Sequence, residues 1–261
     1  MKKILTISLI FLCVGQFAFA DVPPSKTFNS DGTIQDGDTW YGVSIYDTPP
    51  NHTTVNMTGG LIVDNGIAVH NAATFNFSGG SSGWITAYDQ STANIIDGLS
   101  TVSVGDNATG NISGNASVAM ASVGGSGIFN VYGGTIGSVD GWNSSTVNVY
   151  SGTIGGSNQG LGAYDTSVFN LRGGSITYIN SSLPATINVF GLGLAKTATG
   201  GLYGDGQITG FWQDNSPFTI NLSGYNTYST VNLIPEPATF LLFGVGTFLL
   251  RKSKRRILKS E

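Results

Sequence analysis

Residues that could bind a metal ion recur at one position of an internal repeat. This position lies five residues before an asparagine in six copies of the repeat, and it holds Asn71, Asp89, Asp106, Gly125, Asn143 and Asp165. Several oxygen ligands of this kind could hold Ca²⁺. The alternation of Asp with Asn and Gly is also what a chain needs to avoid stacking like charges, and Asx side chains favour turns with left-handed geometry. We therefore predict a row of corners and no metal or other cofactor, with Ca²⁺ binding as the alternative.

Two further sets of residues could act on carbohydrate. Arg172 is the only arginine between residues 21 and 234, and no break in the repeat surrounds it. His52 and His70 are far apart in sequence and indicate surface positions. We therefore predict no catalytic residue. An exposed aromatic strip could instead contact sugars, and its candidates are Trp84, Tyr132, Trp142 and Tyr150.

The asparagines that define the repeat are another set of polar residues with a possible role. The clear copies are "TVNMTGG", "TFNFSGG", "IFNVYGG", "TVNVYSG", "VFNLRGG" and "TINVFG", with asparagines at Asn56, Asn76, Asn130, Asn148, Asn170 and Asn188. Weaker copies contain Asn94, Asn111 and, late in the chain, Asn221. Intervals of 17 to 22 residues indicate one internal repeat of about 18–20 residues. Amides stacked one repeat apart can hydrogen-bond to each other, so we predict a structural ladder.

The elements that position these residues are short strands. Each asparagine lies between two apolar residues, as in Val147-Asn148-Val149, which is the period of a strand with one buried face. A second alternation lies before each corner, as in Val102/Val104 and Val118/Met120. With Gly and Asx corners, this pattern predicts an all-β fold: a right-handed, single-stranded parallel β-helix of about nine stacked coils. A leucine-rich repeat and a β-sandwich fit the spacing less well.

Charge excludes one class of partner. The chain has a formal net charge of −4, but residues 21–234 hold 13 Asp and only Lys26, Arg172 and Lys196, a net charge of −10. So acidic a body cannot neutralise phosphates, and we expect no nucleic-acid partner.

The first 20 residues have the pattern of a secretory signal peptide. Lys2 and Lys3 precede an apolar run, and Ala18-Phe19-Ala20 is a small-residue cleavage pattern, so we expect cleavage after Ala20. The only cysteine, Cys13, would be removed with this leader, which leaves no disulfide.

The last residues combine an apolar run with a basic cluster. Residues 238–250 would form a helix of about 20 Å, short of the ~30 Å hydrocarbon core. The cluster that would hold its end on the cytoplasmic side consists of Arg251, Lys252, Lys254, Arg255 and Arg256. This segment suits a transient stop-transfer helix, and a generic single-pass anchor is the alternative.

The segment "IPEPATFLLFGVGTFLLRKSKRR" resembles the sorting signal of PEP-CTERM proteins, with Pro235-Glu236-Pro237, an apolar helix and a basic end in the same order. The resemblance covers only about the last 27 residues. It implies that exosortase, a membrane transpeptidase-like enzyme, recognises Pro-Glu-Pro, cleaves there, and releases or transfers the protein to the surface of Gram-negative bacteria that make exopolysaccharide. The glycine- and asparagine-rich body also resembles β-helical bodies that often carry this signal.

The chain is thus expected to consist of a signal peptide (1–20), an N-terminal cap (21–50), β-helix repeats (51–190), closing coils and cap (191–233) and a sorting signal (234–261). We expect an exported, non-enzymatic structural or adhesive protein that passes through the inner membrane to the cell surface or extracellular matrix. Exosortase would process it, and exopolysaccharide is a candidate partner. The alternatives are a polysaccharide lyase or hydrolase, or a carbohydrate-binding module, on the same fold.

Overall fold

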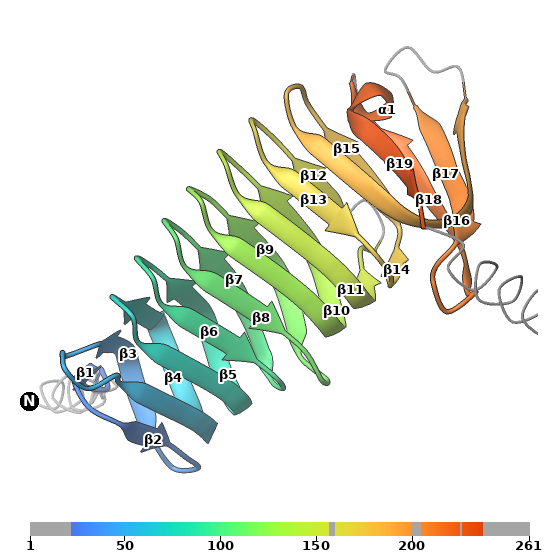
Figure 1. Ribbon diagram of the computed structural model, residues 1–261. Coiled ribbons are helices and arrows are strands. Elements are labelled where there is room, and N and C mark those ends of the chain that lie inside the picture. Colours follow the sequence, from blue (N-terminus) through green and yellow to red (C-terminus); the bar gives the residue numbers. More distant parts are fainter. Residues whose placement is uncertain (1–21, 157–159, 200–204, 225, 237–261) are drawn as a thin grey trace, which may run out of the picture.

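The computed structural model describes residues 22–156, 160–199, 205–224 and 226–236. The fold is nearly all-β, a parallel β-solenoid of about eight turns whose coils follow one another along the stack in chain order (Figure 1). The predicted signal peptide and C-terminal apolar helix fall outside the described residues.

Nine of the strands contain one position of the asparagine row. They are β4 (Thr54–His70), β5 (Thr74–Ala87), β6 (Thr92–Ile95), β8 (Thr109–Ile112), β10 (Ile128–Gly141), β11 (Thr146–Ile154), β13 (Val168–Leu171), β16 (Thr186–Ala198) and β19 (Val231–Pro235). Neighbouring strands of this set pair in parallel with asparagine opposite asparagine, as in Asn130↔Asn148 and Asn148↔Asn170. Strands β4, β5, β10 and β11 continue past the glycine corner, where shifts in pairing register mark the bend.

The other strands complete the coils and close both ends. Within the stack these are β7 (Leu99–Val104), β9 (Ser117–Val123), β12 (Leu161–Ala163), β14 (Ser175–Ile176) and β15 (Tyr178–Ser181). The N-terminal strands are β1 (Lys26–Phe28), β2 (Gly32–Ile34) and β3 (Thr39–Tyr46). Near the C-terminus lie β17 (Gly206–Phe211), β18 (Pro217–Ser223) and one helical turn, α1 (Thr227–Thr230).

The core is a column of apolar side chains inside the coils. From Asn56 to Asn188 the two residues that flank each asparagine are buried, as Val147, Val149, Phe169 and Leu171 illustrate. Because each side chain stacks on its counterpart in the next coil, no coil buries its core alone, and each coil depends on its neighbours for stability.

One expected core residue points outward. Met120 is 42% exposed, whereas Ala121 and Val123 of the same strand are buried. The pairing of β7 with β9 runs from Ser100↔Val118 to Val102↔Ala121, so β9 has one extra residue here. This β-bulge shifts the alternation by one and moves Met120 to the surface.

The C-terminal coils leave the parallel pattern. Strands β16, β17 and β18 form an antiparallel meander, and β19 then returns to pair in parallel with β16. The late copy of the repeat at Asn221 is therefore not part of the asparagine row, because Asn221 lies opposite Tyr178. Asn232, which lies opposite Asn188, takes that place.

Candidate functional site

The asparagine row is a continuous chain of side-chain hydrogen bonds. Each Nδ2 donates to the Oδ1 of the preceding coil at 2.8–3.2 Å, along Asn56, Asn76, Asn94, Asn111, Asn130, Asn148, Asn170, Asn188 and Asn232. An amide inside the row uses one donor and one acceptor on its neighbours. These hydrogen bonds therefore hold the coils in register, and each internal amide keeps one N–H and one acceptor position beyond the ladder.

The corner row has the left-handed backbone expected of it. Backbone φ lies between 51° and 60° at Asn71, Asp89, Asp106, Gly125, Asn143 and Asp165. The carboxylates also bridge coils: Asp89 accepts the backbone N–H of Asn71 at 2.9 Å, and Asp165 accepts that of Asn143 at 3.0 Å. The described residues contain no group of three or more His, Cys, Asp or Glu side chains placed to hold a metal ion.

The four aromatic residues proposed as one strip lie at different positions. Tyr132 and Tyr150 stack with ring centroids 4.9 Å apart. Trp142 stacks instead on Tyr164, with centroids 4.2 Å apart, and Trp84 lies opposite Thr101 on the next coil. Of the four proposed residues, Tyr132 and Tyr150 stack on each other, and the sequence did not indicate Tyr164 as the partner of Trp142.

Another aromatic stack contains His70. Its ring lies between those of Tyr46 and Tyr88, with centroids 4.6 Å and 5.0 Å away. These three residues each stand immediately before a corner of the coil. His70 thus contributes to contact between coils, which its isolated position in the sequence did not suggest.

Arg172 contacts the first part of the Pro-Glu-Pro segment. Its guanidinium lies 3.7 Å from the centroid of the Phe190 ring, and Nη1 lies 3.7 Å from Oε1 of Glu236. Pro235 ends β19, and the backbone N–H of Glu236 donates to Gly191 O at 3.0 Å. Pro237, the cluster Arg251–Arg256 and the cleavage residues Ala18 and Ala20 lie outside the described residues.

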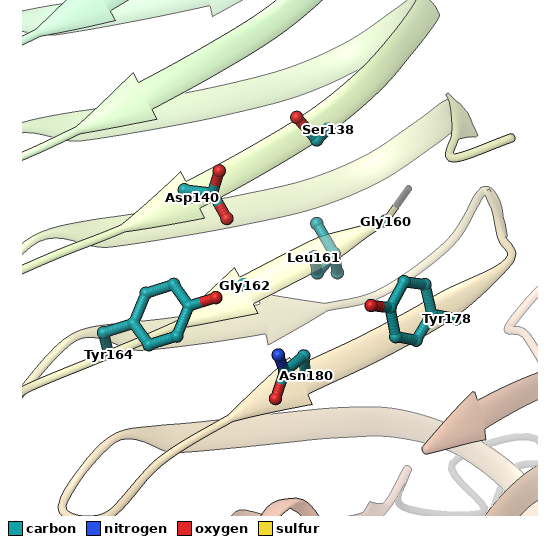
Figure 2. Close-up of a pocket in the computed structure, with 8 residues that line it drawn as sticks. All are labelled: Ser138, Asp140, Gly160, Leu161, Gly162, Tyr164, Tyr178 and Asn180. Atoms are coloured by element: carbon teal, nitrogen blue, oxygen red, sulfur yellow. The ribbon is translucent and has the colours of Figure 1, made fainter. Parts of the chain in front are cut away.

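A pocket of about 210 Å³ opens on another face of the solenoid, between β10, β12 and β15 (Figure 2). Asp140, Gly162 and Asn180 lie opposite one another on these three successive strands. The middle strand, β12, contains Gly162 and is preceded by Gly160. These two glycines stand at positions where the neighbouring coils carry outward side chains. The middle coil contributes no side chain at those two positions, and neighbouring atoms stand close to both glycines: the backbone oxygen of Tyr178 at Gly160, and Oδ1 of Asp140 at Gly162.

Polar groups surround the hollow. Ser138 and Asp140 line it from β10, Tyr178 and Asn180 line it from β15, and Tyr164 reaches over β12 (Figure 2). A Cβ at Gly162 would collide with Oδ1 of Asp140 and lie 2.9 Å from the Tyr164 hydroxyl. The carboxylate and this hydroxyl therefore converge on one point.

The electrostatics of the pocket follow from its partial burial. Burial raises the pKa of Asp140, and no hydrogen bond or cation of the described residues acts against this effect. The pKa of Tyr164 is also raised, first by burial and then by the charge of Asp140 and the proximity of Tyr178. The pocket therefore contains a half-buried carboxylate whose charge no described side chain balances.

The sequence contained one sign of this pocket. The interval from Asn148 to Asn170 is 22 residues, the longest between Asn56 and Asn188, and the glycine-rich stretch from Gly155 to Gly160 lies inside it. Periodicity alone did not identify Asp140, Tyr164 or Tyr178. It indicates which face of a strand a residue occupies, but it does not show that the neighbouring coil has glycine beside that residue.

Comparison of the chain with known protein families, with the sequences of curated proteins and with solved structures finds no match. No helix within the described ranges has the length and apolar character needed to cross a membrane. The functional proposals below therefore rest on the residues of this chain and on the resemblance of its tail.

Proposed function

We propose that this chain is an exported structural or adhesive protein of the cell surface or extracellular matrix, without catalytic activity, that exosortase processes at Pro235-Glu236-Pro237. The observation that supports the proposal most directly is that the Pro-Glu-Pro motif begins where the last strand of the solenoid ends. Strand β19 ends at Pro235, and Glu236 makes the last backbone hydrogen bond to β16. A cut at this motif would separate a complete β-solenoid from the apolar and basic tail.

The architecture of the body supports a structural role. Eight amide hydrogen bonds join nine successive asparagines, and the core runs along the same axis. An elongated body of this kind offers long lateral faces for contact with matrix polymers, and solenoids commonly use extended surfaces for binding. The acidic character of these faces disfavours nucleic acid and leaves exopolysaccharide as the candidate partner.

The route of export follows from the two ends of the chain. The leader directs the chain across the inner membrane, and the tail holds it there as an intermediate until exosortase acts. The contacts of Arg172 with Phe190 and Glu236 support a role in holding the motif to the last coils.

Alanine substitution of Pro235, Glu236 and Pro237 in the producing cells tests the sorting proposal. The apolar run and the basic cluster remain, so export should begin and processing should stall, with the full-length tail retained in the inner-membrane fraction. Leu233→Ala is the control, because it alters β19 and leaves the motif intact, and it should be processed normally. Normal processing of the triple variant would overturn the proposal.

Incubation of the purified protein with acidic and neutral polysaccharides, with and without Ca²⁺, tests the absence of catalysis. We expect neither new reducing ends nor unsaturated products. Products that disappear on Arg172→Ala would instead support the enzyme alternative.

A further inference from the structure

We propose that the pocket between β10, β12 and β15 binds one sugar unit that carries a primary ammonium group, as in an amino sugar of an extracellular polysaccharide. This inference rests on the proposed matrix function and names the chemistry of its ligand. The residues that would contact the sugar are Ser138, Asp140, Tyr164, Tyr178 and Asn180.

The charge of the ligand follows from Asp140. Its outward neighbours in the same row are Ser122 on one side and Gly162 on the other, and neither carries a charge. A carboxylate that has lost part of its hydration is stabilised by an opposite charge within a few ångströms. An ammonium group in the pocket beside Asp140 would supply that charge.

The cations of the described body are engaged elsewhere. Arg172 pairs with Glu236, and Lys196 donates to the carbonyl oxygens of Tyr228 and Val231 at 2.7 and 2.9 Å. Lys26 lies over aromatic rings near the N-terminal end of the solenoid. None of the described lysine or arginine side chains is therefore placed to pair with Asp140, and a cation would have to come from another molecule or another part of the chain.

The groups around the carboxylate favour a sugar over a lysine side chain. Tyr164, Tyr178, Ser138 and Asn180 offer hydroxyl and amide groups, which can donate to and accept from the hydroxyls of a sugar ring. Apart from the three donors of its ammonium group, a lysine side chain would present only methylene groups to them, and it has no acceptor. The two tyrosine rings add faces that attract cations.

The size of the pocket limits the ligand to one unit. A volume of about 210 Å³ lies below the roughly 300–1,000 Å³ of sites that enclose drug-sized ligands. The pocket is also partly open to solvent. A polymer could therefore place one residue in the pocket while the rest of its chain continues along the surface.

The test is a calorimetric titration of the full chain, held in a detergent without sugar groups. The probes are glucosamine trisaccharide, its N-acetylated counterpart and Nα-acetyl-lysine methylamide. We expect the glucosamine trisaccharide to bind with a Kd of about 0.1–1 mM, and the N-acetylated form, which lacks the ammonium group, to bind at least about tenfold more weakly. Equal binding of the two sugars, or no binding of either, would overturn the proposal. Equal or tighter binding of the lysine derivative would do the same.

Two variants connect binding to the pocket. Asp140→Asn keeps the shape and removes the charge, and it should weaken glucosamine binding at least about tenfold. Asp64→Asn makes the same change of net charge at an exposed position on β4 and should leave binding unchanged. Thermal melting shows whether each variant is folded. An unchanged affinity in folded Asp140→Asn would overturn the proposal, and this result would leave the sorting experiment, which is read in cells, unaffected.

Discussion

The asparagine ladder gives the sharpest prediction of stability. Asn148 donates to Oδ1 of Asn130 at 2.9 Å and accepts from Nδ2 of Asn170 at 2.9 Å, so Asn148→Ala removes two hydrogen bonds and leaves two partly buried amide groups without their partner. A net value of about 0.5–1.5 kcal/mol for each bond predicts a loss of about 1–3 kcal/mol in the free energy of unfolding. Urea denaturation followed by circular dichroism measures this quantity.

The end of the ladder provides the matched control. Asn56 makes one ladder bond, to Asn76, and lies at an exposed position. Asn56→Ala should therefore cost about 0.5–1 kcal/mol, clearly less than Asn148→Ala. If both substitutions cost the same, or if Asn148→Ala costs nothing, the amides do not stabilise the stack and the structural interpretation of the row is wrong.

Three further predictions concern single side chains. Val149→Asp places a carboxylate in the core and should cost at least about 3 kcal/mol, whereas Tyr150→Ser, on the outward face of the same strand, should cost about 1 kcal/mol; equal losses in thermal unfolding would reject the assigned faces. Gly80→Ala should lower the free energy of unfolding by at least about 1–3 kcal/mol, because φ is +92° and the new Cβ would stand 2.7 Å from the Gly59 carbonyl carbon. Gly83→Ala is the control, because its Cβ enters open space and should change the free energy of unfolding by less than about 0.5 kcal/mol. Burial raises the pKa of Asp140, so its ionised carboxylate destabilises the folded state above this raised pKa. Asp140→Asn should therefore raise the melting temperature at pH 7, and the increase in melting temperature should vanish below the ordinary pKa of 3.8. An increase that does not depend on pH would contradict this reasoning.

Much of the fold could be predicted because the repeat is strict. Apolar residues on both sides of Asn148 and Asn170 define a buried face, and that face is fully buried in the structure. The corner residues were recognisable because only Gly, Asn and Asp adopt left-handed backbone at low cost, and φ is positive at Asp89 and Asp165.

The remaining features depend on register between coils, which a local pattern does not report. The bulge that exposes Met120 is visible only when β9 is aligned with β7. The antiparallel meander that excludes Asn221 and brings Asn232 into the ladder has the same cause. The pocket likewise arises from Gly162 between Asp140 and Asn180, residues about 20 positions apart that meet only in the folded stack.

The most direct test of the proposed function is the intact mass of the wild-type protein recovered from the cell surface or matrix. The proposal predicts a chain that begins at Asp21 after removal of the leader and that ends in the Pro-Glu-Pro region, without the apolar run. A surface protein that retains Arg251–Arg256 would show that the tail is an ordinary membrane anchor and would contradict the proposal.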